Sequence, residues 1–429
     1  MQVTLQGGAR TGRITAPPSK SRLQRYLLLG ALGETPLTLK FSGQLPEDAW
    51  QLIRCLERLG AVIEAEAGRL RLTPPEKPLR QEELTMLPIG ENGTGFRLLL
   101  PLAGLYDLKL AFLREGSLIG RPIGELTRAL TERGMRFREA GAYVSAEGRL
   151  TAGEFVLPGS ISSQYVSSLL LTLPLLDGES RLLVRGPIGS RGYVDMTLAA
   201  LAEAGLRVSE EQRGEDRLFL IPGGRVPRLP EELTVPGDWS GAAAFLAMGA
   251  LSPAGIRVAG LEEDPCQPDS CFPELLRQMG ASVSRTPEGE LAVRGEGRLT
   301  GTLLDADASP DLVPVFGVLS AFAEGTARIR GGERLRFKES SRLSTLAALL
   351  QALGCAAAVE GGSMDIPGGC PLHGAEAGSA GDHRLAMAAA VAAAGLAPDQ
   401  QIRLSGAMDV TKSFPEFWRC FREMERTER

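Results

Sequence analysis

The sequence is poor in the residues that hold metal ions. Only two histidines occur among 429 residues, and the six cysteines are scattered at positions 55, 266, 271, 355, 370 and 420. Neither histidine lies near the one close pair, Cys266 and Cys271, so no set of residues has the spacing of a zinc site. We therefore expect no bound metal, and free thiols in a reducing cytoplasm rather than disulfides.

Nucleotide-binding motifs and membrane segments are missing as well. There is no GxxxxGK[ST] phosphate loop, and "GENGTG" differs in spacing from the GxGxxG of dinucleotide-binding proteins. The amino-terminal stretch "MQVTLQGGARTGR" lacks the apolar core of a secretory signal. The longest apolar run, near "MAAAVAAAGLA", is about half of the roughly 20 residues that a membrane span requires. These absences predict a cytoplasmic protein that uses no cofactor and binds no membrane.

The charge balance argues against nucleic acid as a partner. Lysine and arginine number 47 against 52 aspartates and glutamates, whereas nucleic-acid-binding proteins carry a basic patch or excess. A hydrophobic content of 43% and a charged content of 23% are typical of globular proteins. A chain of this length exceeds one ordinary core, so we expect two or more domains. Any anionic ligand must be held by a local cluster of cations.

The sequence does contain an internal repeat. An amphipathic helix runs into glycine and is followed by two short strands, as in "LIRCLERLGAVIEAEAGRLRL". Glycine ends a helix readily because it adopts the left-handed conformation without strain. The pattern occurs five times at intervals of 74, 71, 75 and 74 residues, with its glycines at Gly60, Gly134, Gly205, Gly280 and Gly354. This spacing predicts five copies of one structural unit, and "FPEFWRCFREM" begins a sixth.

A second kind of helix alternates with the first and is apolar on all sides. "SSQYVSSLLLTLPLL" and "DHRLAMAAAVAAAGL" are two examples. A helix without a polar face is buried. Six such helices are expected, with starts at Lys20, Thr94, Ser163, Ser240, Asp311 and His383. Each unit therefore combines one buried helix, one surface helix and several strands.

The two ends of the chain complement each other in this scheme. The sixth surface helix runs into the end of the chain before any strand can follow, and the strand "MQVTLQG" can supply the missing piece. One discontinuous domain would then comprise residues 1–17 and 237–429, and residues 18–236 would form an inserted domain. Proline and glycine interrupt the pattern at "APPSK" and "VPGDWS", which places crossings near 17–20 and 235–239. A double crossing of this kind is a natural hinge.

Cations gather at the starts of the buried helices and in the loops between them. A helix amino terminus carries unpaired N–H groups and about half a positive charge, so it attracts anions. Capping explains serine, threonine or aspartate at these positions equally well, but it does not explain cations. A solvated surface charge accounts for any single loop residue, whereas recurrence in the repeat favours one site for phosphate- and carboxylate-bearing substrates. The candidates are Lys20, Arg25, Arg97, Arg121, Lys338, Arg342, Arg384 and Lys412.

Two acids stand among these cations. Asp311 lies at the start of a buried helix, and Glu339 lies between Lys338 and Arg342. Surrounding cations keep a carboxylate ionised, which suits a general base and a charge stabiliser. The alternatives are a helix cap for Asp311 and a surface ion pair for Glu339. The pattern favours acid–base chemistry on small anionic molecules.

Nine motifs, in order along the chain, resemble those of the 5-enolpyruvylshikimate-3-phosphate (EPSP) synthase family. They are "SKSRLQR", "GENGTGFR", "RPIGEL", "SISSQYVSSLL", "SRGYVDMT", "PDLVPVFGVLSAFAEGTARIR", "RFKESSRL", "GDHRLAMA" and "VTKSFPEF". The resemblance implies an α/β (α+β) fold, a two-domain inside-out α/β barrel of six βαβαββ-type repeats. Three repeats form each domain, with buried parallel helices surrounded by sheets, as the spacing also indicates.

The resemblance also implies a reaction. The enolpyruvyl group of phosphoenolpyruvate is transferred to the 5-hydroxyl of shikimate 3-phosphate, and phosphate is released, through a tetrahedral intermediate and with domain closure. The reaction belongs to aromatic amino-acid biosynthesis and uses no cofactor. The family is a target of glyphosate, and Gly93 matches the residue type of sensitive members. A cytoplasmic monomer is expected.

Site residues follow from the same resemblance. Asp311 would be the base on the 5-hydroxyl, and Glu339 with Lys20 would handle proton transfer at the methylene carbon. Shikimate 3-phosphate would contact Lys20, Ser21, Arg25, Ser162, Ser163, Gln164, Ser190, Asp311 and Lys338. Phosphoenolpyruvate would contact Lys20, Gly93, Arg121, Gln164, Arg342, Arg384 and Lys412.

Three positions depart from the family pattern, and two other functions stay open. Glu91 replaces a usual asparagine, Gly192 replaces a common proline, and Arg334 stands where many relatives have asparagine or glutamate. A related transferase with another acceptor would differ at Ser162, Ser163, Ser190 and Arg25. A catalytically dead ligand-binding relative would have lost Asp311, Glu339 or Lys20, and all three are present.

Overall fold

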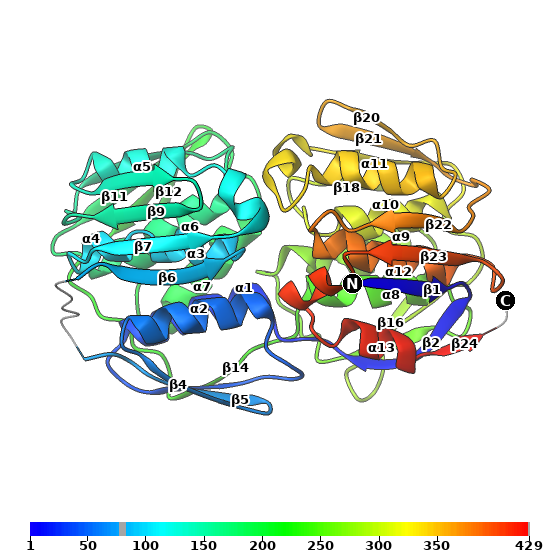
Figure 1. Ribbon diagram of the computed structural model, residues 1–429, viewed down its shortest axis with the longest axis horizontal. Helices are drawn as coiled ribbons and strands as arrows, with labels where there is room; N and C mark the ends of the chain where they lie inside the picture. The colour runs from blue at the N-terminus through cyan, green and yellow to red at the C-terminus, as the bar shows by residue number, and fades with distance from the viewer. Residues whose placement is uncertain (77–82, 428–429) are drawn as a thin grey trace. The chain divides into compact units, whose positions relative to one another are not determined.

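The chain folds into two compact units, each with its own helices and sheets (Figure 1). The structure is a computed structural model and describes residues 1–76 and 83–427. The terminal unit comprises Met1–Ser19, Ser42–Glu47 and Pro236–Arg429, and the inserted unit comprises Lys20–Phe41 and Asp48–Val235. Ser42–Glu47, which we expected in the inserted domain, is tied to the terminal unit because the Gln44 amide donates a hydrogen bond to Glu416 Oε2 at 2.9 Å.

The second copy of the repeat shows the plan that the first five copies share, while the last copy has the single strand β1 in place of a strand pair. Two parallel strands, β6 and β7, are joined through a buried helix, and a surface helix then leads to the antiparallel pair β8 and β9. The sheet order is β6-β7-β9-β8, because β9 inserts next to β7. The elements are β6 (Thr85–Gly90), α3 (Gly93–Leu99), α4 (Leu102–Leu105), β7 (Leu110–Arg114), η1 (Gly116–Gly120), α5 (Gly124–Thr131), β8 (Arg136–Ala140) and β9 (Tyr143–Glu147).

The other two copies of the inserted unit follow the same plan. Their sheets have the orders β14-β3-β5-β4 and β10-β11-β13-β12. The first copy consists of α1 (Lys20–Leu32), β3 (Leu37–Lys40), α2 (Glu47–Arg58), β4 (Val62–Glu66), β5 (Arg69–Thr73) and β14 (Glu232–Thr234). The third consists of β10 (Glu154–Pro158), α6 (Ser163–Thr172), η2 (Leu173–Leu175), β11 (Ser180–Arg185), α7 (Arg191–Glu203), β12 (Ser209–Arg213) and β13 (Asp216–Ile221).

The terminal unit contains three further copies, with sheets ordered β16-β17-β15-β2-β24, β18-β19-β21-β20 and β1-β23-β22. The first is built from β2 (Ala9–Thr15), α8 (Trp239–Ala250), β15 (Ile256–Ala259), η3 (Pro268–Cys271), α9 (Phe272–Gln278), β16 (Ser282–Arg285), β17 (Leu291–Arg294) and β24 (Glu425–Thr427). The second is built from β18 (Leu303–Asp305), α10 (Val313–Ala321), β19 (Thr326–Arg330), η4 (Glu333–Phe337), α11 (Arg342–Ala352), β20 (Ala358–Glu360) and β21 (Ser363–Pro367). The third is built from β22 (Ala375–Gly378), α12 (His383–Gly395), β23 (Gln401–Ser405), η5 (Ala407–Lys412), α13 (Phe417–Glu423) and β1 (Gln2–Gln6).

The amino-terminal strand completes the last copy, as its sequence predicted. The expectation that no strand follows the sixth surface helix was wrong, because β24 follows α13 and pairs with β2. β1 pairs antiparallel with β23 from Gln2↔Ser405 to Gln6↔Gln401. Two other strands pair within their own unit although each leads into a helix of the other unit. β2 leads into α1 but pairs with β15, and β14 leads into α8 but pairs with β3. The segments that follow these strands meet at a bridge between Pro18 and Gly237.

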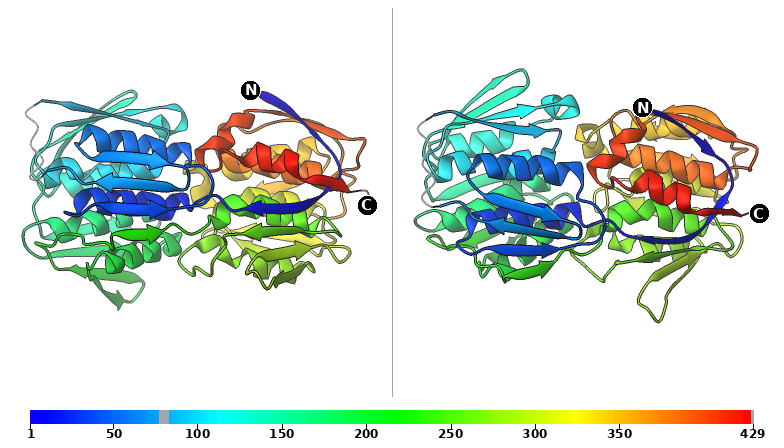
Figure 2. Two further views of the ribbon diagram at one scale, coloured as in Figure 1. Left: turned by 90° about the horizontal axis from the view of Figure 1, so that it is seen from below. Right: turned by 60° about the horizontal axis from the view of Figure 1, so that its bottom comes forward.

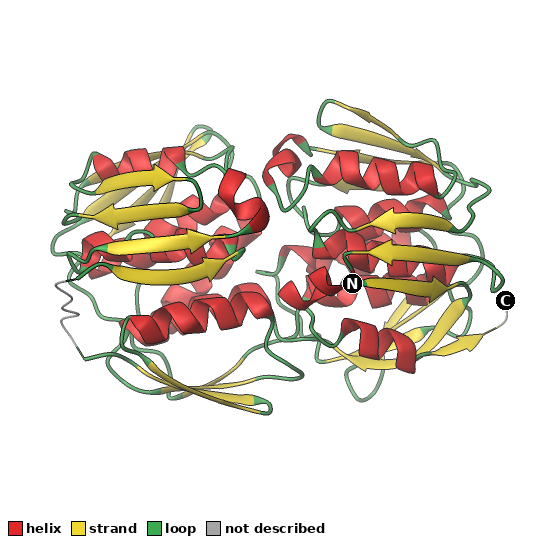
Figure 3. Ribbon diagram, viewed as in Figure 1, coloured by secondary structure: helices red, strands yellow, loops and turns green. Residues whose placement is uncertain are grey.

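The apolar helices form the core of each unit, and Figures 2 and 3 show strands on the outside. Within the terminal unit α8, α10 and α12 pack against one another, and every residue of α12 is buried. Alanine and glycine make this close packing possible because their side chains occupy little space. Gly317 of α10, for example, lies so close to α11 that a Cβ atom would approach Leu346 Cδ2 to 2.5 Å.

Most helix limits agree with the sequence predictions. The glycines after five surface helices all have positive φ, between 74° and 107°. Helices α1, α6 and α12 begin at the predicted Lys20, Ser163 and His383, while α3 and α8 begin one residue early. The prediction for Asp311 was wrong by two residues, because α10 begins at Val313. Asp311 therefore lies in the loop before the helix.

Candidate active site

Arg342 is the centre of the polar cluster in the terminal unit. It is the first residue of α11 and is fully buried. Its guanidinium contacts three carboxylates: Nη1 lies 2.7 Å from Asp311 Oδ1, Nη2 lies 2.9 Å from Glu339 Oε2, and Nε lies 2.9 Å from Asp382 Oδ2. Burial lowers the pKa of Arg342, but the three carboxylates outweigh burial and raise it well above its usual value. Arg342 therefore stays protonated, and the three carboxylates balance its buried charge.

Asp311 faces three cations. Besides the contact with Arg342, its carboxylate lies 3.5 Å from Arg384 Nη2 and 3.8 Å from Lys338 Nζ. Burial raises the pKa of Asp311, but Lys338, Arg342 and Arg384 more than offset this effect and hold the pKa well below its usual range. Asp311 is ionised at neutral pH, as the sequence predicted, and its side chain keeps 18% exposure. An ionised carboxylate that remains reachable can accept a proton from a ligand.

Lys338 and Glu339 precede α11 and stay partly exposed, with 25% and 16% of their side chains accessible. Arg384 is buried on the first turn of α12. Lys412 is buried on η5, which packs against α12. The structure thus brings Asp311, Glu339, Lys338, Arg342 and Arg384 into one connected group and places Lys412 on an element beside it.

Two further carboxylates support this group, and we did not single them out from the sequence. Asp382, fully buried, caps α12 by accepting a hydrogen bond from the Arg384 amide at 2.9 Å. Asp269, 1% exposed, accepts a hydrogen bond from Ser240 Oγ, and its Oδ1 atom has no hydrogen-bond partner among the described residues. Burial, together with the charge of Asp311, raises the pKa of Asp269 to about 7. Asp382 lies in the quoted motif "GDHRLAMA", directly before the predicted helix start at His383. This position could have identified it from the sequence.

Lys20 is held at the start of α1 in the inserted unit. Its Nζ atom lies 2.8 Å from Asp48 Oδ2, and both side chains are largely buried. The Asp48 carbonyl in turn accepts a hydrogen bond from Asn92 Nδ2 at 2.5 Å. Asn92 caps α3 through a 2.7 Å bond from the Gly95 amide. Lys20 is thereby linked to the amino terminus of α3 through one aspartate.

A second group in this unit surrounds Gly93. A Cβ atom on Gly93 would lie 2.7 Å from Arg121 Nη1 and 2.9 Å from Arg97 Nη1. Arg97 Nη1 donates to Gln164 Oε1 at 2.9 Å, and Gln164 Nε2 donates to Thr94 Oγ1 at 2.9 Å. The helix starts of α3 and α6 are therefore joined. Gly93, Arg121 and Gln164, all expected at the phosphoenolpyruvate site, lie together.

Arg25 ties α1 to the start of α7. Its Nη1 donates to the Ser21 carbonyl at 2.7 Å, its Nη2 to the Tyr193 carbonyl at 2.9 Å, and its Nε to Thr197 Oγ1 at 2.8 Å. Burial lowers the pKa of Arg25 to about 10, so it remains charged at neutral pH. Its charge contributes positive potential beside the start of α7.

The three predicted serines occupy helix starts. Ser162 caps α6 through a 3.3 Å bond from the Gln164 amide, and Ser163 is the first residue of that helix. Ser190 precedes α7 and has φ 53°, a left-handed conformation that is unfavourable for a residue with a side chain. Such strain is found at functional positions more often than elsewhere.

Comparison with known proteins identifies the family. The model of EPSP synthase (3-phosphoshikimate 1-carboxyvinyltransferase) matches residues 5–421. This chain belongs to the EPSP synthase family. A 3-phosphoshikimate 1-carboxyvinyltransferase of Aeropyrum pernix is 37% identical over 415 residues, which cover 95% of this chain and 91% of the relative. One of Clostridium beijerinckii is 32% identical over 425 residues, which cover 97% and 96%.

A solved EPSP synthase structure has the same fold. The enzyme from Acinetobacter baumannii matches with a TM-score of 0.78 at 25% identity, over the full length of both chains. The predicted α/β fold with two domains is therefore confirmed.

Two departures from the EPSP synthase motifs find local partners. Glu91 Oε1 accepts a hydrogen bond from the Ser117 amide at 2.8 Å. Arg334 donates from Nε to Asp307 Oδ1 at 2.8 Å.

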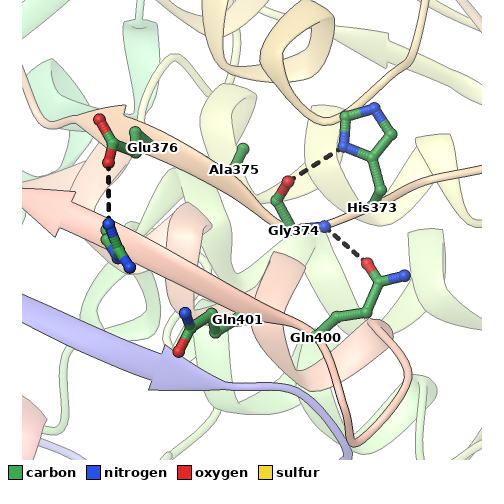
Figure 4. A pocket seen from close by; sticks show the side chains of 7 residues that line it. His373, Gly374, Ala375, Glu376, Gln400 and Gln401 are labelled. Atoms are coloured by element: carbon green, nitrogen blue, oxygen red, sulfur yellow. Dashed lines mark hydrogen bonds and ion pairs between the residues drawn. The ribbon is translucent and has the colours of Figure 1, made fainter.

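The described residues contain no group of three or more histidine, cysteine, aspartate or glutamate side chains arranged to hold a metal ion. Among their helices, none combines the length and the apolar character needed to cross a membrane. A surface pocket of about 440 Å³ beside His373 and Gln400 contains none of the predicted site residues (Figure 4).

Proposed function

We propose that this EPSP synthase family member transfers the enolpyruvyl group of phosphoenolpyruvate to the 5-hydroxyl of shikimate 3-phosphate and releases phosphate. The observation that carries the proposal is the reachable, ionised Asp311 held among Lys338, Arg342 and Arg384. A base surrounded by cations suits a reaction between two anionic molecules, because the cations bind the anions and keep the base deprotonated.

Asp311 and Glu339 would divide the proton transfers. Asp311 takes the proton of the 5-hydroxyl while that oxygen forms a bond with C2 of phosphoenolpyruvate. The methylene carbon C3 receives a proton at the same stage, and Glu339 with Lys20 is assigned to this transfer. The tetrahedral adduct then loses a proton from C3 and the phosphate from C2, which restores the double bond. General acid–base catalysis of this kind contributes roughly 10² to 10⁴ in rate.

The remaining cations would bind the substrates. Arg342, Arg384 and Lys412 of the terminal unit, with Lys20, Gly93, Arg121 and Gln164 of the inserted unit, are assigned to phosphoenolpyruvate. Shikimate 3-phosphate is assigned to Lys20, Ser21, Arg25, Ser162, Ser163, Gln164 and Ser190, with Asp311 and Lys338. The buried ion pairs of Arg342 hold its guanidinium in place before a ligand arrives, which reduces the entropy lost on binding.

The proposal includes closure of the two units around the substrates, with the crossings near 17–20 and 235–239 as hinges. Hydrogen bonds from the Ser19 amide to the Pro236 carbonyl and from the Asp238 amide to the Pro17 carbonyl, both 2.8 Å, support this assignment because they bind the two crossings together. We also propose a cytoplasmic monomer that acts on small anionic substrates. A decrease in the radius of gyration on adding both ligands, measured by solution scattering, is expected, and no decrease would contradict closure.

The reaction itself is tested by mixing the protein with both substrates and measuring phosphate. Release is expected only when phosphoenolpyruvate and shikimate 3-phosphate are present together. Shikimate without its phosphate serves as the control acceptor and should be used poorly. Equal use of another acceptor would favour a related transferase, and ligand binding without any release would favour a catalytically inactive relative.

The role of Asp311 is tested by Asp311→Asn. This variant should lose about 10³-fold in turnover, the middle of the range for a general base, while still binding shikimate 3-phosphate. Asp365→Asn is the matched control, because Asp365 is an exposed aspartate that pairs with Arg328 on the surface. Turnover of Asp311→Asn equal to that of Asp365→Asn would remove Asp311 from its role as base.

A further inference from the structure

Two of the six cysteines lie next to each other in the terminal unit. Cys355 follows α11, and Cys370 follows β21. Their Sγ atoms approach the same acceptor, the Pro367 carbonyl, at 3.4 Å and 3.1 Å. Because both thiols approach one carbonyl oxygen, their sulfur atoms lie close together. Cys355 is 1% exposed, while Cys370 is half-buried and open to small reagents.

Backbone hydrogen bonds hold both cysteines in this arrangement. The Cys355 amide donates to the Leu350 carbonyl at 2.8 Å, and the Gly369 amide donates to the Ala323 carbonyl at 2.7 Å. Beyond Cys370, the His373 amide donates to the Leu353 carbonyl at 3.0 Å. Figure 4 shows the next anchor, a 2.6 Å bond from the Gly374 amide to Gln400 Oε1. The two thiols are therefore kept together by the main chain on both sides.

We propose that Cys355 and Cys370 form a redox-active dithiol that closes to a disulfide when the protein meets a peroxide. The first step joins Cys370 Sγ to one peroxide oxygen, breaks the O–O bond and releases water, leaving a sulfenic acid. The Cys355 sulfur then attacks Cys370 Sγ, and the S–O bond breaks to release a second water. Two thiols are oxidised by two electrons in total, and one peroxide is reduced.

The exposure of the two residues decides this order. Cys370 can be reached from solvent, so it reacts first. Burial, with the neighbouring Cys370, raises the pKa of the Cys355 thiol to about 12, which makes Cys355 a poor target for free peroxide. Its place beside the same carbonyl as Cys370 nevertheless puts it within reach of the oxidised sulfur. Cys355 is thus the resolving thiol.

The disulfide would act as a clamp within the second repeat of the terminal unit. It would close a loop over residues 355–370, which contain the hairpin of β20 and β21. It would also join the end of α11 to the segment that leads to β22. Cross-linking restricts the unfolded chain, so the oxidised protein should be more resistant to heat than the reduced protein.

The test exposes the full-length protein to hydrogen peroxide and counts thiols in denaturant. Two of the six thiols should be lost and should return with dithiothreitol. Trypsin cannot separate the two cysteines because no lysine or arginine lies between them, but a glutamate-specific protease cuts after Glu360. The two resulting peptides should stay joined until reduction and should separate after it. The melting temperature should rise by roughly 5 °C on oxidation.

Variants make the result specific. The double variant with Cys266→Ser and Cys271→Ser should still lose two thiols, because Cys271 contacts Ser309 rather than a second cysteine. Cys370→Ser, at the more exposed position, should abolish the cross-link, and Cys355→Ser should leave a sulfenic acid at Cys370. Three results would each overturn the proposal: no loss of thiols, loss of thiols without a disulfide between the two peptides cut at Glu360, or a disulfide that involves Cys266 or Cys271.

Discussion

Asp382 should be one of the most destabilising positions to mutate in the terminal unit. Its carboxylate is fully buried and accepts hydrogen bonds from Arg342 Nε at 2.9 Å, from Ser340 Oγ at 3.2 Å and from the Arg384 amide at 2.9 Å. Replacing it with alanine removes a charged partner of Arg342 and the cap of α12 in one step. The prediction concerns the free energy of unfolding of this unit.

The size of the effect follows from these contacts. Breaking a buried ion pair by removing one partner costs about 3–5 kcal/mol, and losing a helix cap costs about 1 kcal/mol. Arg342 keeps Asp311 and Glu339 as partners, which reduces the first cost. We therefore expect Asp382→Ala to lower the free energy of unfolding by about 3–4 kcal/mol. Asp382→Asn keeps an oxygen for the cap and should lower it by about 2 kcal/mol.

The assay is urea unfolding followed by tryptophan fluorescence. Trp239 and Trp418 lie in the terminal unit and Trp50 lies in the inserted unit, so a Trp50→Phe background isolates the terminal unit. Asp365→Ala is the matched control, because Asp365 binds Arg328 in a two-bond pair of 2.6 and 2.7 Å on the surface. An exposed pair contributes little to stability, because water screens its charges. If Asp382→Ala lowered the free energy of unfolding no more than this control, the buried Asp382–Arg342 pair would not stabilise the terminal unit as argued.

Three other predictions follow from the geometry. Gly93→Ala should raise the KM for phosphoenolpyruvate about tenfold with kcat largely kept, because the new methyl group displaces Arg121. An unchanged KM in steady-state kinetics would show that Gly93 does not lie at the phosphoenolpyruvate site. Asp48→Asn should lower turnover about tenfold, since Lys20 loses its 2.8 Å ion pair, and equal turnover at saturating substrate would show that the pair does not orient the lysine. In the folded state the pKa of Asp269 is raised from 3.8 to about 7. Between about pH 4 and 7 the folded state therefore holds a proton that the unfolded state has lost. The contribution of Asp269 to stability falls as pH rises through that window. Asp269→Asn should flatten the dependence of unfolding free energy on pH there, and an identical profile would place the titration elsewhere.

Local patterns in the sequence predicted much of the fold. The six apolar helices and the five glycine-terminated helices appeared as repeats, because a buried helix lacks a polar face and a left-handed turn favours glycine. The place of β1 in the last repeat followed from counting which repeat lacked a strand. The ionised state of Asp311 followed from the cations that recur at the same place in each repeat.

Other features depended on contacts between residues far apart in the chain. The pairing partners of β2 and β14 cannot be read from either strand, because a strand of three to seven residues fits many partners and only the assembled sheets select one. Asp48 and Asp382 are common residue types whose importance comes from the buried cations they meet, Lys20 and Arg342. The sequence by itself determined the repeating elements and the kinds of charge in the site, since both are set by local periodicity and composition. Only the tertiary structure decided which strands pair and which carboxylate holds which cation, since these depend on distances that folding alone creates.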